Sequence, residues 1–370
     1  MHVVICGGGA IGASTAYYLS RRDVAVTVVE RTGIACAASG KSGGFLARQW
    51  SDGLPGEELA RRSFDLHAEL AAELGGDAWG YRRLTTYAGH ADPWEHSHRK
   101  GYDVAWLSDG VTVTQEIGSP GNTAQVHPGL YTRAMMQAAE THGAVLRLAR
   151  VTGLARDRNR VTGVQIEGGD VIQADAVVIA MGPWSILAAM WLPLPAIFGL
   201  KGHSLVFDTG TSVPAEAAFL EYPDSGETLS PELFPRPDGT TYVCGISGEE
   251  PLPLDPAAVM PDEKSIARLE RLCANVSPVL ASAPIVARQA CFRPIARDGV
   301  PVIGDIPGVE NAYVATGHSV WGILNAPATG EAMAELITEN RASRIDLEPF
   351  RPNRLPPLDP ARLRRAVQGA

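Results

Sequence analysis

Residues 3–30 read VVICGGGAIGASTAYYLSRRDVAVTVVE, and this stretch decides the fold. A continuous apolar run leads into a glycine-rich turn, which is followed by apolar residues at helical spacing and then by a second apolar run. A continuous apolar run is typical of a parallel strand that is buried on both faces. The stretch therefore predicts a strand, a tight turn, a helix and a second, parallel strand.

The turn carries a GxGxxG pattern at Gly7, Gly9 and Gly12. The first glycine permits the turn, the second lets a pyrophosphate approach the backbone, and the third lets the helix pack closely on the strand. The start of the helix then offers free N–H groups to the phosphates. Glu30 ends the second strand, 18 residues after Gly12, where an acid binds the hydroxyls of a ribose.

This context favours a dinucleotide site over a glycine-rich turn without a ligand. The acid disfavours NADP, because a carboxylate repels the 2′-phosphate. The stretch does not distinguish NAD from FAD.

The composition excludes several classes of protein. A chain of 370 residues exceeds the size of one hydrophobic core, so two domains are expected. Hydrophobic residues at 45% and charged residues at 20% are typical of a soluble globular protein. The net charge of −9 argues against nucleic acid or an anionic membrane as the main partner.

The chain carries no targeting or metal pattern that we can identify. No signal-peptide pattern precedes Val3, which indicates a cytoplasmic protein, and glycines and prolines interrupt the longest apolar stretch, 176–200. The five scattered cysteines match neither a disulfide framework nor a CxxC zinc site and are expected to be reduced. His90, His96 and His98 have the spacing of no standard metal site, so we expect a solvated loop there.

Residues 35–44 are small apart from Lys41, so their backbone is open to a flat or phosphorylated ligand, although a flexible loop is the alternative. A buried strand over 174–182 ends on glycine, where it can lie under a nucleotide. Helical spacing or strand-like composition predicts the remaining elements. They are helices over 56–74, from Pro128, over 262–276 and through Met333 to Ile337, strands at 144–148, 204–207, 241–246 and 312–316, and a hairpin of 161–166 with 170–172.

A shift to proline, glycine and threonine over 200–285 suggests a second, sheet-based domain inserted into the first. We expect three parts, namely a discontinuous first domain of 1–85, 120–200 and 286–345, a second domain of 86–119 and 201–285, and an extended tail of 346–370. Near the C-terminal end, a helix begins at Gly322, and its N-terminus presents amides and a positive dipole end.

Five segments together resemble the D-amino acid oxidase superfamily of FAD-dependent amine oxidoreductases. They are GGGAIGASTAYYLSRR, ASGKSGGFLA, DAVVIAMGPWS, and RPIARDGVPVIG with ATGHSVWGILNAPATG. The last motif is similar to that of glycine oxidases. The motifs NTAQVHP, QACFRP and GHSVWGILN resemble a plant and fungal branch of FAD oxidoreductases that is related to sarcosine-oxidase-like proteins.

The resemblance implies an α/β fold with a Rossmann-like, GR2-type FAD-binding domain built on a parallel sheet, and a substrate domain with a mixed or antiparallel sheet. It implies FAD as cofactor, with a helix N-terminus aimed at the part of the flavin where negative charge gathers on reduction. The cofactor-binding residues that it implies are Gly7, Gly9, Ala10, Ile11, Gly12, Glu30, Arg31, Ser39, Ser42, Gly43, Gly44, Phe45, Val151, Ala180, Gly182, Trp184, Cys291, Gly317, Gly322, Ile323 and Leu324.

The same resemblance implies catalytic roles. Arg293 matches the arginine that holds a substrate carboxylate, which a two-pronged guanidinium suits, although an ion pair is the alternative. Trp321 and Phe45 are expected to wall the site, and His318 either acts as a base or braces its loop. Val320 or Trp321 replaces the second basic residue that glycine oxidases carry there, so an amine with a large apolar part fits as substrate.

Cys291 falls where sarcosine-oxidase-like members attach flavin covalently, but a small buried side chain is the alternative, and non-covalent FAD is expected. Lys201 matches a structural turn, and no lysine that assists the reaction with oxygen is recognisable.

The activity implied is oxidation of the C–N bond of an amine or amino acid, by hydride transfer to flavin N5, with O2 giving H2O2. A dehydrogenase that uses a quinone or protein acceptor and a non-catalytic flavoprotein assembly factor remain alternatives. The sequence does not predict the oligomeric state.

Overall fold

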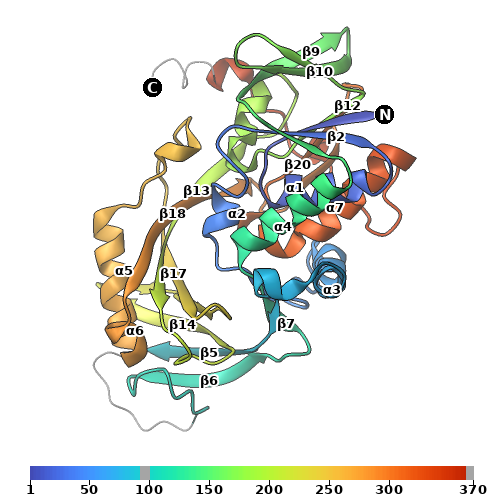
Figure 1. Cartoon of the computed structure of the whole chain (residues 1–370). Helices are drawn as coiled ribbons and strands as arrows, with labels where there is room; N and C mark the ends of the chain where they lie inside the picture. Colours follow the sequence, from blue (N-terminus) through green and yellow to red (C-terminus); the bar gives the residue numbers. More distant parts are fainter. Residues whose placement is uncertain (92–100, 364–370) are drawn as a thin grey trace.

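The structure is a computed structural model that describes residues 1–91 and 101–363 (Figure 1). Of the three histidines in the predicted loop, His96 and His98 lie outside these ranges. Among the described residues, no three His, Cys, Asp or Glu side chains gather as a metal site would require. No helix within those ranges has both the length and the hydropathy of a membrane span.

A six-stranded sheet forms the centre of the first unit, in the order β19-β20-β12-β1-β2-β8. All neighbours are parallel except β19 and β20. The strands are β1 (His2–Cys6), β2 (Ala25–Glu30), β8 (Val145–Leu148), β12 (Ala176–Ile179), β19 (Val302–Asp305) and β20 (Ala312–Thr316). The prediction of a parallel, Rossmann-like sheet is confirmed.

Alternate residues of β1 pack into different layers, because side chains of a strand point to opposite faces. Val3 and Ile5 pack against a helical layer, whereas Val4 and Cys6 pack against a small antiparallel sheet. The helices are α1 (Ala10–Ser20), α3 (Glu57–Leu74), α4 (Pro128–Thr141) and α7 (Gly322–Glu339), and the strands of the small sheet are β9 (Val151–Asp157), β10 (Arg160–Ile166) and β11 (Val171–Gln173). The predicted helices and the predicted hairpin are therefore present.

A mixed sheet forms the second unit, at the lower left of Figure 1, in the order β18-β13-β17-β16-β14-β5-β6, with β15 beside β14. Only β14 and β5 are parallel neighbours in it. Its strands are β5 (Thr85–Ala91), β6 (Val111–Gly118), β13 (Ile197–Asp208), β14 (Glu216–Asp224), β15 (Glu227–Leu229), β16 (Glu232–Pro235), β17 (Thr240–Gly248) and β18 (Ile285–Ala296). Helices α5 (Glu263–Val276) and α6 (Pro278–Ser282) pack on one face, which leaves the other face toward the first unit.

Two segments lie differently from the expected division. β18, which was expected in the first domain, pairs with β13 from Ile197↔Ala296 to Phe207↔Ile285 and so belongs to the second sheet. The tail is not extended throughout, because 348–350 and 352–354 are 3-10 turns. Phe350 of the tail is buried against the helical layer of the first unit.

Helix α7 contains Pro327, which cannot donate to the carbonyl four residues earlier. That carbonyl belongs to Ile323 and instead accepts from His67 Nε2 of α3 at 3.0 Å, while Leu324 O lies 3.2 Å from the same nitrogen. The hydroxyl of Ser63, one turn before His67, accepts from the N–H of Ala328 at 3.1 Å. Helix α3 therefore satisfies the backbone groups that the proline leaves free.

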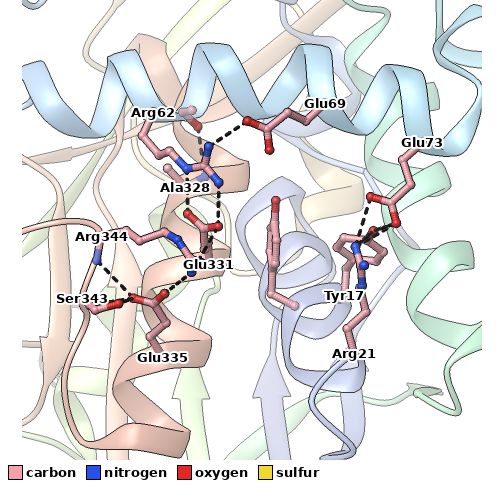
Figure 2. Close-up of polar contacts among 12 residues, drawn as sticks. Tyr17, Arg21, Arg62, Glu69, Glu73, Ala328, Glu331, Glu335, Ser343 and Arg344 are labelled. Atoms are coloured by element: carbon pink, nitrogen blue, oxygen red, sulfur yellow. Dashed lines mark hydrogen bonds and ion pairs between the residues drawn. The ribbon is translucent and has the colours of Figure 1, made fainter.

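Ion pairs hold the outer part of α7 (Figure 2). Arg62 of α3 donates to both carboxylate oxygens of Glu331, at 3.0 and 2.9 Å. Glu335, one turn later, is almost fully buried and accepts from the N–H and hydroxyl of Ser343, at 2.6 and 3.0 Å, and from Arg344. These contacts fix the axis of α7, whose N-terminus faces the site described below.

We expect His67→Leu to lower the free energy of unfolding by about 2 to 3 kcal/mol, because two buried carbonyl groups of α7 lose their donor. Equilibrium urea unfolding measures this. The control is His142→Leu, at the exposed C-cap of α4, which should change stability little. Equal losses in both variants would contradict the role of His67.

The His67 imidazole also predicts a dependence on pH. Burial lowers the pKa of His67 to about 4, although its hydrogen bonds to Ile323 and Leu324 raise it. The unfolded chain takes up that proton near pH ~6.5, so stability is lost as the pH falls from there toward 4. The His67→Leu variant should therefore lose less stability than the wild type between pH 7 and pH 5 in the same unfolding measurement.

Candidate active site

A cavity of about 460 Å³ opens between the two units. It begins at the carboxyl ends of β1, β2 and β12, where ligands bind in open α/β sheets, and continues to the inner face of the mixed sheet. Eighteen residues of the predicted site line it. They are Gly7, Gly9, Ala10, Ile11, Glu30, Arg31, Ser39, Ser42, Gly43, Val151, Ala180, Gly182, Trp184, Cys291, Arg293, His318, Gly322 and Ile323.

The glycine turn between β1 and α1 leaves no room for side chains. At Gly7, φ is +114° and a Cβ would lie 2.3 Å from the carbonyl oxygen of Ala180. At Gly12, a Cβ would lie 2.0 Å from the carbonyl oxygen of Gly7. The start of α1 has N–H groups without helical partners; that of Ala10 donates to Ser39 Oγ at 2.9 Å, and those after it are backbone donors that a ligand can use.

Glu30 is held in place by backbone donors. Its Oε2 accepts from the N–H of Gly8 at 2.7 Å, and its Oε1 accepts from the N–H of Thr32 at 2.9 Å. Oε1 also lies near the N–H of Gly33 and the thiol of Cys36, whereas Oε2 keeps a further lone pair with which it can accept from a ligand hydroxyl.

A loop of the second unit closes this end of the cavity. Arg31 donates to the carbonyl of Leu254 at 2.8 Å and forms an ion pair with Asp255 at 3.1 Å. The indole N–H of Trp184 donates to the carbonyl of Pro253 at 2.8 Å. Two predicted cofactor residues therefore bind the loop directly as well as lining the cavity.

The middle of the cavity lies between the 42–43 segment and the start of α7, and it contains buried polar atoms without partners. In residues 1–91 and 101–363, neither Ser42 Oγ nor His318 Nδ1 has a hydrogen-bond partner. The other ring nitrogen of His318 lies 3.0 Å from Thr329 Oγ1. Burial lowers the pKa of His318 to about 3, so this imidazole is neutral in the folded protein near neutral pH.

The far end of the cavity is the inner face of the mixed sheet. Arg293 lies over Gly202, where a Cβ would be 2.8 Å from Nη2, and it donates to the hydroxyl of Ser247. Tyr242, Cys244 and Glu232 also line this end. The sequence predictions missed these three residues, although Tyr242 and Cys244 are two apart in a strand and Glu232 is a lone acid beside an apolar pair.

Six predicted residues lie outside the lining. Phe45 stacks on Phe234 with ring centroids 5.2 Å apart, and Trp321 packs edge-on against Trp50 at 6.1 Å. Both rings thus belong to an aromatic layer behind the wall. Gly12, Gly44, Gly317 and Leu324 complete the six, the first three as turn or close-packing positions and the last as a buried residue of α7.

Known proteins resemble this chain along nearly its whole length. The family model described as DAO, FAD dependent oxidoreductase, matches residues 2–336. A putative oxidoreductase of Schizosaccharomyces pombe is 31% identical over 380 residues, which cover 94% of this chain and 96% of that protein.

Glycine oxidases are also similar. That of Pseudomonas aeruginosa is 27% identical over 375 residues, which cover 95% of this chain and 98% of that enzyme. The crystal structure of glycine oxidase from Geobacillus kaustophilus superposes with a TM-score of 0.80 at 25% identity, covering 95% of this chain and 97% of that one.

The cavity fits FAD, the cofactor of that family. The bare turn at Gly7 suits a pyrophosphate, the anchored carboxylate of Glu30 suits a ribose, and the unpartnered Ser42 Oγ and His318 Nδ1 are free to bond a polar ring edge.

We expect non-covalent flavin despite the position of Cys291. Burial raises the pKa of this thiol, and although Arg293 and Lys41 lower it, the thiolate that would attack a flavin is scarce at neutral pH. Acid precipitation of the purified protein should leave the flavin in the supernatant. Yellow colour that stays with the precipitate in the wild type and disappears in Cys291→Ser would contradict this.

Proposed function

The chain belongs to the DAO family of FAD-dependent oxidoreductases, and we propose that it oxidises the carbon–nitrogen bond of an amino acid or related amine, with O2 as electron acceptor. The observation that carries this proposal is the placement of Arg293. Within the described ranges no carboxylate lies within ion-pair distance of its guanidinium, which faces the cavity beside Ser247. An arginine in such a position suits a substrate carboxylate, which it grips with two parallel donors.

In the overall reaction, an amino acid, O2 and water give an oxo acid, ammonia and H2O2. The carbon that bears nitrogen loses two electrons, the substrate becomes an imine, and water hydrolyses it. FAD, when bound in this cavity, would supply the acceptor for the hydride and the route by which the two electrons reach oxygen. The names of the relatives support this class, since those of Pseudomonas and Geobacillus are glycine oxidases.

The protein's own residues bind, orient and exclude water. We assign the ADP part of FAD to the turn at Gly7–Ile11 and to Glu30, and its ring system to Ser42–Gly43 and Gly322–Ile323. The N-terminus of α7 then lies where negative charge develops, and a helix N-terminus stabilises such charge. Arg293 holds the substrate so that its C–H bond faces the ring, which is catalysis by orientation.

No side chain has to act as a base, because a neutral amine can release hydride directly. The buried His318 stays unprotonated near neutral pH, so it can accept a hydrogen bond through Nδ1 but brings no charge. The pH profile should therefore follow the substrate amine rather than this histidine.

The reaction class is tested by mixing the FAD-loaded protein, without oxygen, with a panel of amines and of D- and L-amino acids. At least one compound should bleach the flavin absorbance near 450 nm, and admission of air should restore it with one H2O2 per turnover. Bleaching without peroxide would identify a dehydrogenase that needs another acceptor. Absence of bleaching by the whole panel would contradict the proposed function.

We expect Arg293→Leu to lower kcat/KM for a carboxylate substrate by about 30- to 1000-fold, the effect of removing one partner of a buried charge pair. The flavin spectrum should stay unchanged, because Arg293 is assigned to the substrate. Arg288→Leu is the matched control on the same strand, since Arg288 pairs with Glu270 of α5 at 2.7 Å on the far face of the sheet. Equal activity of the two variants would contradict the assignment of Arg293 to the substrate carboxylate.

A further inference from the structure

A second charged side chain, Glu232, faces the substrate end of the cavity. Glu232 begins β16, and in the sheet it pairs with Cys244 of β17, which is next to β13 and then β18. Cys244, Gly202 and Cys291 come from these three neighbouring strands and form the cavity floor. Glu232 therefore lies on β16, at one side of the cavity floor, whereas Arg293 lies on β18, at the other side.

The two charged groups do not form an ion pair with one another. In the part of the chain that the structure describes, the polar contact of the Glu232 carboxylate is with the thiol of Cys244, at 3.6 Å, and no ion pair reaches it. The guanidinium of Arg293 lies over Gly202 of β13 and reaches Ser247 of β17, the strand beside β16, but it forms no ion pair with Glu232. Both side chains line the cavity of about 460 Å³, so one ligand can contact both of them.

An unpaired acid at this depth is costly unless something positive binds it. Burial raises the pKa of Glu232, and Arg293 and the Cys244 thiol lower it. The strands beside it are held by backbone pairing and by apolar residues on the other face of the sheet, so their pairing does not depend on the carboxylate. The acid thus has the placement of a ligand-binding group.

We infer that Glu232 binds a second positively charged group of the substrate, so that the cavity selects amino acids with a basic side chain. Arg293 takes the carboxylate and Glu232 takes the distal ammonium, across the cavity floor of small residues. The inference rests on the proposed function and names the substrate class of the same site.

A pair of ligands that lack the oxidisable α-amine tests this on the FAD-loaded protein. 6-Aminohexanoate and hexanoate share a carboxylate for Arg293, and only the first carries a distal ammonium. Their dissociation constants are measured without oxygen, from the change in flavin absorbance and from calorimetry. The wild type should bind 6-aminohexanoate at least about 30-fold more tightly, and Glu232→Gln should abolish the preference while hexanoate binds as before.

Glu221→Gln serves as the matched control, because Glu221 is an exposed acid on β14 of the same sheet and lies outside the cavity. It should retain the preference. Equal binding of the two ligands by the wild type, or a preference that survives in Glu232→Gln, would overturn the inference.

Turnover separates the inference from the proposed function. The kcat/KM for lysine should exceed that for its neutral counterpart norleucine. In Glu232→Gln the two values should become equal. If Glu232→Gln lowers both values equally, the acid binds the reacting amine and the inference is wrong, although the oxidase function stands. If no compound bleaches the flavin but the ligand preference persists, the proposed function fails and the binding role of Glu232 remains.

Discussion

The cavity depends on one close contact, between the glycine turn after β1 and the end of β12. Gly7 approaches Ala180 so closely that a Cβ would meet its carbonyl oxygen at 2.3 Å, and Gly12 approaches Gly7 in the same way. Because the turn lies flat against its neighbours, backbone donors rather than side chains face the ligand. The acid at Glu30 and the strand ends beside it are then arranged around a path wide enough for a dinucleotide.

A second constraint places the opposite wall. The start of α7 must lie at the cavity, yet Pro327 breaks the hydrogen bonds of its first turns. Ser63 and His67 are four residues apart on α3 and so lie on one face of that helix, from which they bond the freed groups. The neutral imidazole suits this place because a charged ring would be buried without a counter-ion. Helix α3 thus holds the interrupted part of α7 in place. A helix N-terminus that is fixed in this way is what a preorganised charge site requires.

Sequence alone predicted the parallel sheet, the glycine turn and most of the helices, because these depend on local periodicity. It predicted Arg293 only through a motif resemblance. It could not predict that Phe45 and Trp321 lie behind the wall, since a stacked layer such as Phe45 on Phe234 joins residues from distant strands. Glu232 was missed because the faces of the mixed sheet are set by register, which the proline- and glycine-rich stretch 200–285 does not reveal.

Register in that sheet is altered beside the site itself. Between Cys244 and Ile246, the pairing of β17 with β13 shifts by one residue, at Gly245. Before the shift Tyr242 and Cys244 face the cavity, and after it Ile246 faces α5 while Ser247 reaches Arg293. A bulge of this kind re-aims side chains without a change of strand order. It allows one strand to supply both Cys244, whose thiol contacts Glu232, and Ser247, whose hydroxyl accepts from Arg293, so both charged residues are contacted from the two sides of one bulge.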